Sequence, residues 1–487
     1  MPDAAPCSRP AAKGGHAITT IETDYLVIGA GAAGMAFVDA LIAETDADVV
    51  MVDRRHCPGG HWNDAYPFVR LHQTSAYYGV NSRVLGSDLI DETGVNAGFY
   101  ERATAPEICD YYRRVMDESL LKSGQVRFFG MSEYLGFDRG VSAFASLLTG
   151  ATTTVDVRRK VVDARYLEPS VPSTHRPSFE IDPDARFATV NDLARLSEPA
   201  SAYTIIGGGK TAMDACTWLL EGGVDPDRIR WIRPRDSWVL DRAYFQPLQL
   251  VTSLIDGFSL AAEASAQAES LDDLFARLES CGQLMRLDAT VTPEMFHSAT
   301  LSRAELELLQ TIDNVVRLGH VRRIGVQEIS LEHGSIPTDR GQVHVDCSAA
   351  GLRRAPPRPV FEPGRITLQP IRTVVPPFNA AFAGYVEATR DDDTERSRLC
   401  PTNPYPETAL DWLPNMYITL ESLTRWNEQP DINEWLERSR LNIARGIFSH
   451  ADDPRMLAAL TRLLTYTEPA ITNLRKLHGS AEAGVAG

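Results

Sequence analysis

Two short glycine-rich segments carry the spacing of dinucleotide-binding loops. In such a loop the first glycine makes a tight turn, the second lets backbone amides approach a pyrophosphate, and the third small residue lets a helix pack on the preceding strand. The helix then points its positive N-terminus at the phosphates. We therefore predict two dinucleotide sites, one at each loop. The loops read Gly29-Ala-Gly31-Ala-Ala-Gly34 and Gly207-Gly-Gly209-Lys-Thr-Ala212.

The residues that follow the two loops differ at the position expected to contact the adenosine ribose. Asp53 follows the apolar run after the first loop, where a carboxylate can accept hydrogen bonds from two ribose hydroxyls. Arg233 and Arg235 follow the apolar run after the second loop, where guanidinium groups pair well with a 2′-phosphate. The first loop therefore predicts FAD and the second NADPH. A solvated basic turn is the alternative interpretation of the two arginines.

The elements around these loops predict an α/β fold. Apolar runs suited to buried parallel strands precede both loops, and apolar residues at helical spacing follow them. We expect two Rossmann-like dinucleotide-binding domains, for FAD and NADPH, with a helical insertion and a helical C-terminus. The insertion is either structural packing or a lid over the substrate. The expected ranges are 1–21 for a flexible tail, 22–170 and 345–487 for the FAD-binding domain, 185–344 for the NADPH-binding domain and about 246–312 for the insertion.

The composition is that of an ordinary globular protein. The chain has 487 residues, of which 44% are hydrophobic and 23% charged, and its formal net charge is −17. Because nucleic acids and anionic membranes attract basic surfaces, the acidic balance argues against both as partners. No apolar run approaches the roughly 20 residues that span a bilayer, and the N-terminal segment lacks the apolar core of a signal peptide. We expect a cytoplasmic protein of undetermined oligomeric state.

The cysteines are dispersed, which is typical of a reducing compartment. Disulfide reductases that share the double-loop layout need two cysteines a few residues apart beside the flavin. Dithiol relay chemistry is not expected here, because the sequence contains no CxxC or CxxxxC. No His/Cys cluster has metal-ligand spacing, so we expect no metal. The seven cysteines are Cys7, Cys57, Cys109, Cys216, Cys281, Cys347 and Cys400.

A longer stretch after the first loop resembles a known motif. Residues 58–75 read PGGHWNDAYPFVRLHQTS. This stretch is similar to the GGxW…YPGxRxDxxS segment of flavoproteins with two dinucleotide domains, and within them of the flavin-containing and Baeyer–Villiger monooxygenases. The resemblance is specific over residues 22–235 and extends to the remainder only in outline. It implies that Gly60, His61 and Trp62 line the FAD.

The chain departs from that family pattern in two places. Within the stretch, Phe68 replaces a glycine and His72 replaces an aspartate. In addition, those monooxygenases carry FxGxxxHxxx(F/W/Y) just before the second loop, whereas residues 187–197 here read FATVNDLARLS and contain no histidine. The resemblance therefore implies the fold and the cofactors more strongly than it implies oxygen insertion.

The resemblance implies an FAD-dependent, NADPH-using monooxygenase that oxygenates a small organic molecule through a C4a-(hydro)peroxyflavin, with molecular oxygen as co-substrate. Two alternatives remain open: a flavin dehydrogenase or reductase that inserts no oxygen, and a non-enzymatic redox-sensing nucleotide-binding protein. His72 is the candidate catalytic residue. A helix expected to start near Pro377 would aim its N-terminus at the flavin. The candidate cofactor-binding residues are Gly29, Gly31, Ala33, Gly34, Asp53, Arg54, Gly60, His61, Trp62, Gly207, Gly209, Lys210, Thr211, Ala212, Arg233, Arg235, Phe378 and Asn379.

Overall fold

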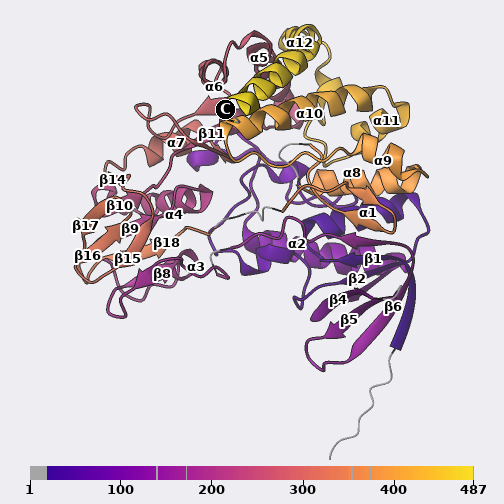
Figure 1. Cartoon of the computed structure of the whole chain (residues 1–487), viewed down its shortest axis with the longest axis horizontal. Coiled ribbons are helices and arrows are strands. Elements are labelled where there is room, and N and C mark those ends of the chain that lie inside the picture. Colours follow the sequence, from indigo (N-terminus) through magenta and orange to yellow (C-terminus); the bar gives the residue numbers. More distant parts are fainter. Residues whose placement is uncertain are drawn as a thin grey trace, which may run out of the picture.

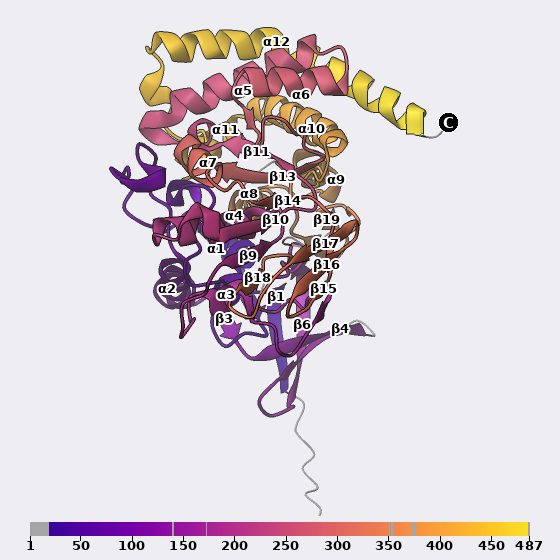
Figure 2. The same cartoon turned by 90° about the vertical axis from the view of Figure 1, so that its left-hand side faces the viewer.

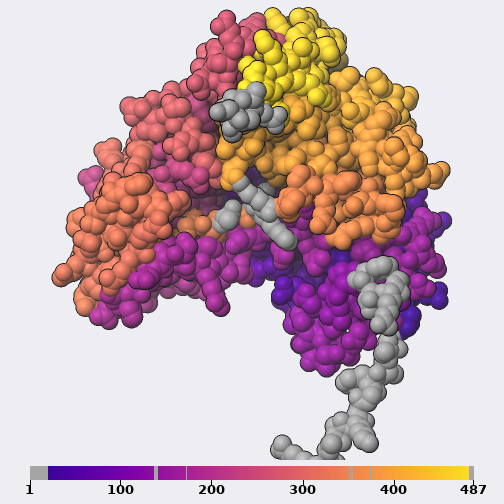
Figure 3. Space-filling model, viewed as in Figure 1, coloured from indigo at the N-terminus to yellow at the C-terminus, as the bar shows by residue number. Residues whose placement is uncertain are grey.

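Two lobes, each built on a parallel sheet, lie side by side beneath a layer of helices (Figure 1). The first lobe contains β1 (Thr19–Ile28) and β2 (Val49–Val52), and the second contains β9 (Tyr203–Ile206) and β10 (Ile229–Ile232). A broad notch separates the two lobes along one side of the molecule (Figure 3). The computed structural model describes residues 19–138, 141–171, 173–349, 351, 355–372 and 376–485.

The first lobe is built around β1 (Thr19–Ile28), which pairs in parallel with β2 (Val49–Val52) and with β6 (Thr152–Asp163). The strand order is β19-β20-β6-β1-β2-β3. All of β2 and the last four residues of β1 are buried, as expected of strands covered on both faces. The other strands are β3 (Val126–Phe129), β4 (Ser132–Asp138), β5 (Val141–Ser146), β19 (Phe361–Glu362) and β20 (Arg365–Thr367).

Helices cover one face of this sheet and a hairpin covers the other. α1 (Ala32–Glu44), which follows the first loop, packs along α8 (Pro376–Thr389). On the opposite face the hairpin of β4 and β5 packs against the sheet through Phe144. Because β19, β20 and α8 follow the second lobe in sequence, the chain returns to complete the first lobe. α2 (Ala105–Val115) lies beside the segment that resembles the flavoprotein motif.

The second lobe repeats this plan. Its sheet has the order β14-β10-β9-β18-β8 with every pairing parallel, and a second sheet of order β17-β16-β15-β7 packs against it. α4 (Lys210–Glu221) follows the second loop. The strands are β7 (Glu180–Ile181), β8 (Phe187–Thr189), β9 (Tyr203–Ile206), β10 (Ile229–Ile232), β14 (Val315–Val316), β15 (Val321–Ile324), β16 (Glu328–Leu331), β17 (Gly334–Pro337) and β18 (Val343–Asp346), with α3 (Val190–Leu193) after β8.

These two parallel sheets confirm the predicted α/β fold. The segment predicted as a helical insertion contains three helices, and it also includes most of a small three-stranded sheet of order β12-β11-β13 that its composition did not reveal. Its elements are α5 (Val251–Gln267), α6 (Leu271–Ser280), β12 (Leu284–Met285), β13 (Met295–Leu301) and α7 (Arg303–Leu309), and β11 (Ser237–Asp241) precedes it.

The described chain from α8 to its C-terminal end is helical, as predicted. α12 (Pro454–Val485) lies along α5 and α10 and closes the top of the molecule (Figure 2). One continuous apolar core connects both lobes with this helical layer. The remaining helices are α9 (Asp393–Leu399), α10 (Ala409–Asn427) and α11 (Pro430–Arg438). No helix among the described residues is long and apolar enough to cross a membrane.

Candidate dinucleotide-binding site

The first loop has the geometry that its glycines predict. Gly29 has a φ of +106°, in the region that favours glycine. A Cβ on Gly34 would overlap the carbonyl oxygen of Gly29, so the helix can pack on the loop only if residue 34 is glycine. The loop also meets the motif-like stretch, because a Cβ on Gly60 would lie 3.0 Å from the Cα of Gly31.

The helices that follow the two loops begin without side-chain caps. α1 starts after Gly31 and α4 after Gly209, and neither has a side-chain hydrogen bond at its N-cap or an acidic residue in its first turn. By contrast, α7 starts with a capping box formed by Ser302 and Glu305, and α2 and α10 have equivalent boxes. The N-terminal N–H groups of α1 and α4 are therefore available to an external acceptor such as a phosphate.

Asp53 lies at the end of β2 and touches the first loop. One of its carboxylate oxygens accepts a hydrogen bond from the Ala30 N–H at 2.7 Å, and the other accepts from the Arg55 N–H at 2.8 Å. Each oxygen keeps a further lone pair for a ribose hydroxyl. The neighbouring Arg54 is directed elsewhere, since it pairs with Glu133 at 2.7 Å.

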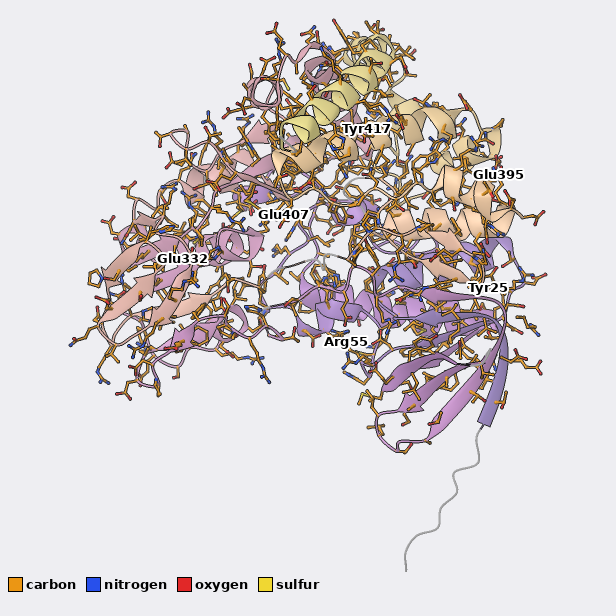
Figure 4. All side chains as sticks on the ribbon, viewed as in Figure 1. Tyr25, Arg55, Glu332, Glu395, Glu407 and Tyr417 are labelled. Carbon is orange, nitrogen blue, oxygen red and sulfur yellow. The ribbon has the colours of Figure 1, made fainter. Side chains whose placement is uncertain are left out.

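The motif-like stretch runs from the first loop toward the second lobe. Arg55, which precedes it, lies between Tyr25 of the first lobe and Glu332 of the second (Figure 4). Within the stretch, the short 3₁₀ helix Gly60–Asp64 carries His61 and Trp62. Trp62 is buried and its indole N–H donates to the Tyr78 hydroxyl at 2.8 Å. Burial lowers the pKa of His61 to about 4, so this imidazole is uncharged at neutral pH.

The second loop is also shaped by its glycines. Gly207 has a φ of +133°, and a Cβ there would lie 2.7 Å from the carbonyl oxygen of Cys347. A Cβ on Gly209 would meet nothing within 4 Å. The second glycine of this loop therefore faces open space of the kind that a pyrophosphate would fill, while the small residue Ala212 is fully buried against the sheet.

Lys210, a predicted cofactor-binding residue, has protein partners for its ammonium group. The ammonium group is buried and paired with the carboxylates of Asp214 and Glu305, the latter at 3.2 Å. Glu305 in turn accepts from Arg242 at 2.7 Å. Because both carboxylates lie beside the ammonium, Lys210 adds no net positive charge to the loop. The adjoining Thr211 stays a predicted contact.

The two arginines after β10 have different environments. Arg233 is 3% exposed, stacks its guanidinium on the Trp231 ring at 4.7 Å from the centroid, and approaches Asp236 at 3.5 Å. The Nε of Arg233 is buried and has no hydrogen-bond partner among the described residues, so its contact with the 2′-phosphate stays a prediction. Arg235 is exposed, and its carbonyl oxygen adjoins Gly208 of the loop. Of the two arginines, Arg235 has the more accessible guanidinium group.

His72 lies close to the second loop, with Lys210 nearby. Its side chain is exposed, and its pKa is lowered to about 4, first by desolvation of the ring and then by the cations Lys210 and Arg102. Arg242 fixes the backbone here by donating to the His72 carbonyl oxygen at 3.3 Å.

Phe378 and Asn379, the two residues predicted to contact the flavin at the start of α8, have side chains that contact Arg372. Phe378 is fully buried, and the Arg372 guanidinium lies 3.9 Å from its ring centroid, so its side chain is not free to contact a cofactor. The Asn379 amide exchanges two hydrogen bonds with the Arg372 backbone, at 3.1 and 3.0 Å. Only the backbone at the start of this helix remains a candidate for the flavin.

Sequence reasoning did not single out the residues that join the two lobes. The Tyr66 hydroxyl donates a hydrogen bond to Asp214 at 2.6 Å, and Phe68 stacks on Trp218 with ring centroids 4.6 Å apart. Tyr66 and Phe68 belong to the motif-like stretch, whereas their partners lie on α4. No local signal marks these contacts, because the paired residues are about 150 positions apart in the chain. Within the described ranges no group of acidic, histidine and cysteine side chains could hold a metal ion.

Comparison with known proteins adds three findings. A family model described as an NAD(P)-binding Rossmann-like domain matches residues 27–81, which include the first loop and Asp53. Among solved structures, cyclohexanone monooxygenase with bound cyclohexanone is 14% identical, with 78% of this chain and 92% of that chain covered and a TM-score of 0.46. Oxidized steroid monooxygenase bound to NADP is 13% identical, with 95% and 98% covered and a TM-score of 0.45.

Two mycobacterial relatives are much more similar in sequence. Uncharacterized proteins of Mycobacterium tuberculosis and Mycobacterium bovis are each 46% identical to this chain over 425 residues. The alignments cover 87% of this chain and 78% of each relative. At this identity and coverage, the chain belongs to the same protein family as these uncharacterized mycobacterial proteins.

Proposed function

We propose that the chain is an FAD-dependent oxidoreductase that accepts hydride from NADPH and, more specifically, a monooxygenase acting on a small organic molecule. One observation carries the proposal. Each glycine loop leads into a helix that has no side-chain cap, and the groups that follow the two loops have opposite charge. The Asp53 carboxylate beside the first loop suits the free ribose hydroxyls of FAD, and the exposed Arg235 beside the second suits the 2′-phosphate of NADPH.

The residues of both loops fit these groups. FAD would be held by Gly29, Gly31 and Asp53, with the free N–H groups of α1 directed to its pyrophosphate. NADPH would be held by Gly209 and Arg235, because the space beside Gly209 is open and α4 is equally uncapped. When bound, the flavin supplies hydride acceptance from NADPH and the reaction with molecular oxygen.

His72 has a defined role in this proposal. The pKa of its imidazole is lowered to about 4, so at neutral pH the uncharged ring can donate one hydrogen bond and accept another. It therefore orients a substrate rather than supplying a proton as imidazolium. Arg242 holds the His72 carbonyl oxygen, which keeps this part of the backbone in place as ligands enter and leave.

The monooxygenase assignment rests on the motif-like stretch of residues 58–75. The absence of the family's histidine from residues 187–197 favours the second candidate, a flavin reductase that inserts no oxygen. Turnover under heavy-isotope oxygen, scored by mass spectrometry of the products of a substrate screen, separates the two. A product that carries the isotope, formed with NADPH consumption above the rate without substrate, supports the monooxygenase. Stoichiometric release of labelled hydrogen peroxide with every compound would leave the reductase.

A further inference from the structure

Two adjacent aromatic contacts fasten the first lobe to the helix of the second loop. The Tyr66 hydroxyl donates to Asp214 at 2.6 Å, and the Phe68 ring stacks on Trp218 with an angle of 14° between the ring planes. Asp214 and Trp218 are four residues apart and therefore share one face of α4. Tyr66 and Phe68 are two residues apart in the facing segment. We name these four residues the clasp.

The clasp has a rigid anchor on the side of the second lobe. Asp214, which accepts from Tyr66, is also ion-paired with the buried Lys210. Lys210 pairs with Glu305 of α7 at 3.2 Å, and Arg242 pairs with Glu305 at 2.7 Å. Because these charges are buried and mutually compensated, their geometry is costly to distort. A displacement of α4 would therefore have to break the clasp or this ion-paired network.

The location of the clasp connects the two proposed cofactor sites. Tyr66 follows Gly60 and Trp62 in the stretch assigned to the FAD, while α4 begins at the loop assigned to NADPH. Phe68 is also one of the two positions at which the stretch departs from the family pattern, which has a glycine there. A glycine has no ring to stack on Trp218, so this contact is a feature of the present chain.

We propose that Tyr66 and Phe68 are positioning residues that set the separation between the nicotinamide and the flavin. The inference rests on the proposed function. Hydride transfer requires the reacting atoms to lie about 3–3.5 Å apart, and a misplacement of about 1 Å costs on the order of 100-fold in rate. Because the clasp orients α4 as a whole, its loss slows hydride transfer while leaving the contacts that bind NADPH intact.

Three variants and one matched control test this role. Tyr66→Phe removes only the hydroxyl that reaches Asp214, and Phe68→Gly removes the side chain that carries the stacked ring. Phe68→Tyr keeps an aromatic ring at that position and serves as the rescue variant. The control is Tyr385→Phe, because Tyr385 also donates to an aspartate, Asp431 at 3.1 Å, but joins α8 to α11 rather than one lobe to the other.

The measurement is anaerobic stopped-flow reduction of the flavin by NADPH, with hydrogen exchange of residues 210–221 as a readout independent of activity. We expect Tyr66→Phe and Phe68→Gly to lower the limiting reduction rate roughly 10- to 100-fold. The dissociation constant for NADPH should change less than about twofold, a difference of under 0.5 kcal/mol. Exchange in α4 should become faster. Phe68→Tyr and Tyr385→Phe should retain the wild-type rate.

The outcomes separate this inference from the function on which it rests. If NADPH reduces the wild-type flavin and both clasp variants are reduced equally fast, the clasp proposal is overturned and the proposed function stands. A rise in the NADPH dissociation constant at an unchanged limiting rate would make Tyr66 and Phe68 binding residues and would also overturn it. If the wild-type flavin is not reduced at all, the proposed function fails and the positioning role fails with it, whatever the exchange of α4.

Discussion

The carboxylate of Asp53 accepts a hydrogen bond from the backbone N–H of Ala30 at 2.7 Å, which ties the end of β2 to the first glycine loop. The same carboxylate accepts from the Arg55 N–H, so its orientation is fixed before any ligand arrives. A preorganised acceptor loses little conformational entropy on binding. The first loop is therefore built in the conformation that a dinucleotide requires.

Two glycine substitutions should distinguish a glycine that the fold requires from a glycine that ligand binding requires. Gly34→Ala places a methyl group on the Gly29 carbonyl oxygen, so we expect it to lower the free energy of unfolding by about 4 kcal/mol or more and to abolish FAD retention. Gly209→Ala meets no atom of the protein and should leave the unfolding free energy unchanged or raise it by up to about 1 kcal/mol. It should nevertheless weaken NADPH binding. Urea denaturation measures the unfolding free energy and NADPH titration measures the affinity. A strongly destabilised Gly209→Ala variant would contradict the finding that the space beside Gly209 is open.

The two arginines after β10 should give opposite phenotypes. Arg235→Ala removes an exposed guanidinium, so we expect the Michaelis constant for NADPH to rise roughly 10- to 100-fold, with little change for NADH and in stability. Arg233→Ala removes a buried group stacked on Trp231 and should mainly destabilise the second lobe. Steady-state kinetics with both nucleotides, combined with thermal unfolding, distinguish the two. Equal effects of Arg235→Ala on NADPH and NADH would remove the 2′-phosphate assignment.

Those arginines illustrate what the sequence could and could not predict. The loop glycines and Asp53 were identifiable, because a dinucleotide loop is encoded by residues close together in the chain. The pairing of Lys210 with Glu305 was not predictable, because the two residues are 95 positions apart in the chain. The burial of Arg233 was not predictable either, because its stacking on Trp231 depends on the course of the chain after β10.

Contacts between helices and strands that are distant in the sequence were not predictable for the same reason. The helical character of α5 and α12 follows from composition, but their mutual packing does not. The clasp was missed for that reason, since Tyr66 meets Asp214 only after two lobes have been placed side by side. The small sheet of β11, β12 and β13 was missed because its strands are short and separated by helices.

The depressed pKa values of His61 and His72 make stability depend on pH. Both imidazoles have a pKa of about 4 in the folded chain, below the ordinary value of 6.5, so the unfolded chain binds more protons between these limits. The contribution of these two imidazoles to the free energy of unfolding should therefore rise as pH increases from about 4 to about 6.5. Above pH 6.5 that contribution should stay constant. Urea denaturation of wild type and of the double variant His61→Asn, His72→Asn at pH 5 and pH 7 tests this.

The substituted protein should lose less stability on acidification than the wild type. An equal slope in the two proteins would show that His61 and His72 do not contribute.

The buried ion-paired network should be sensitive to the loss of one charge. Glu305→Gln leaves Lys210 and Arg242 without the carboxylate between them, so we expect the free energy of unfolding to fall by about 3–5 kcal/mol. The exposed pair of Arg340 and Asp184 provides the comparison, and Arg340→Ala should cost at most about 1 kcal/mol. Urea denaturation gives both values, and similar losses would contradict the role of burial.

Anaerobic mixing of the purified protein with NADPH tests directly whether the two loops bind FAD and NADPH. We expect the protein to retain FAD, NADPH to bleach the flavin absorbance, and NADH to do so at a much higher concentration. We expect Arg235→Ala to remove this preference. A protein that retains no FAD, or whose flavin stays oxidised in saturating NADPH, would contradict the assignment of the two loops to FAD and NADPH.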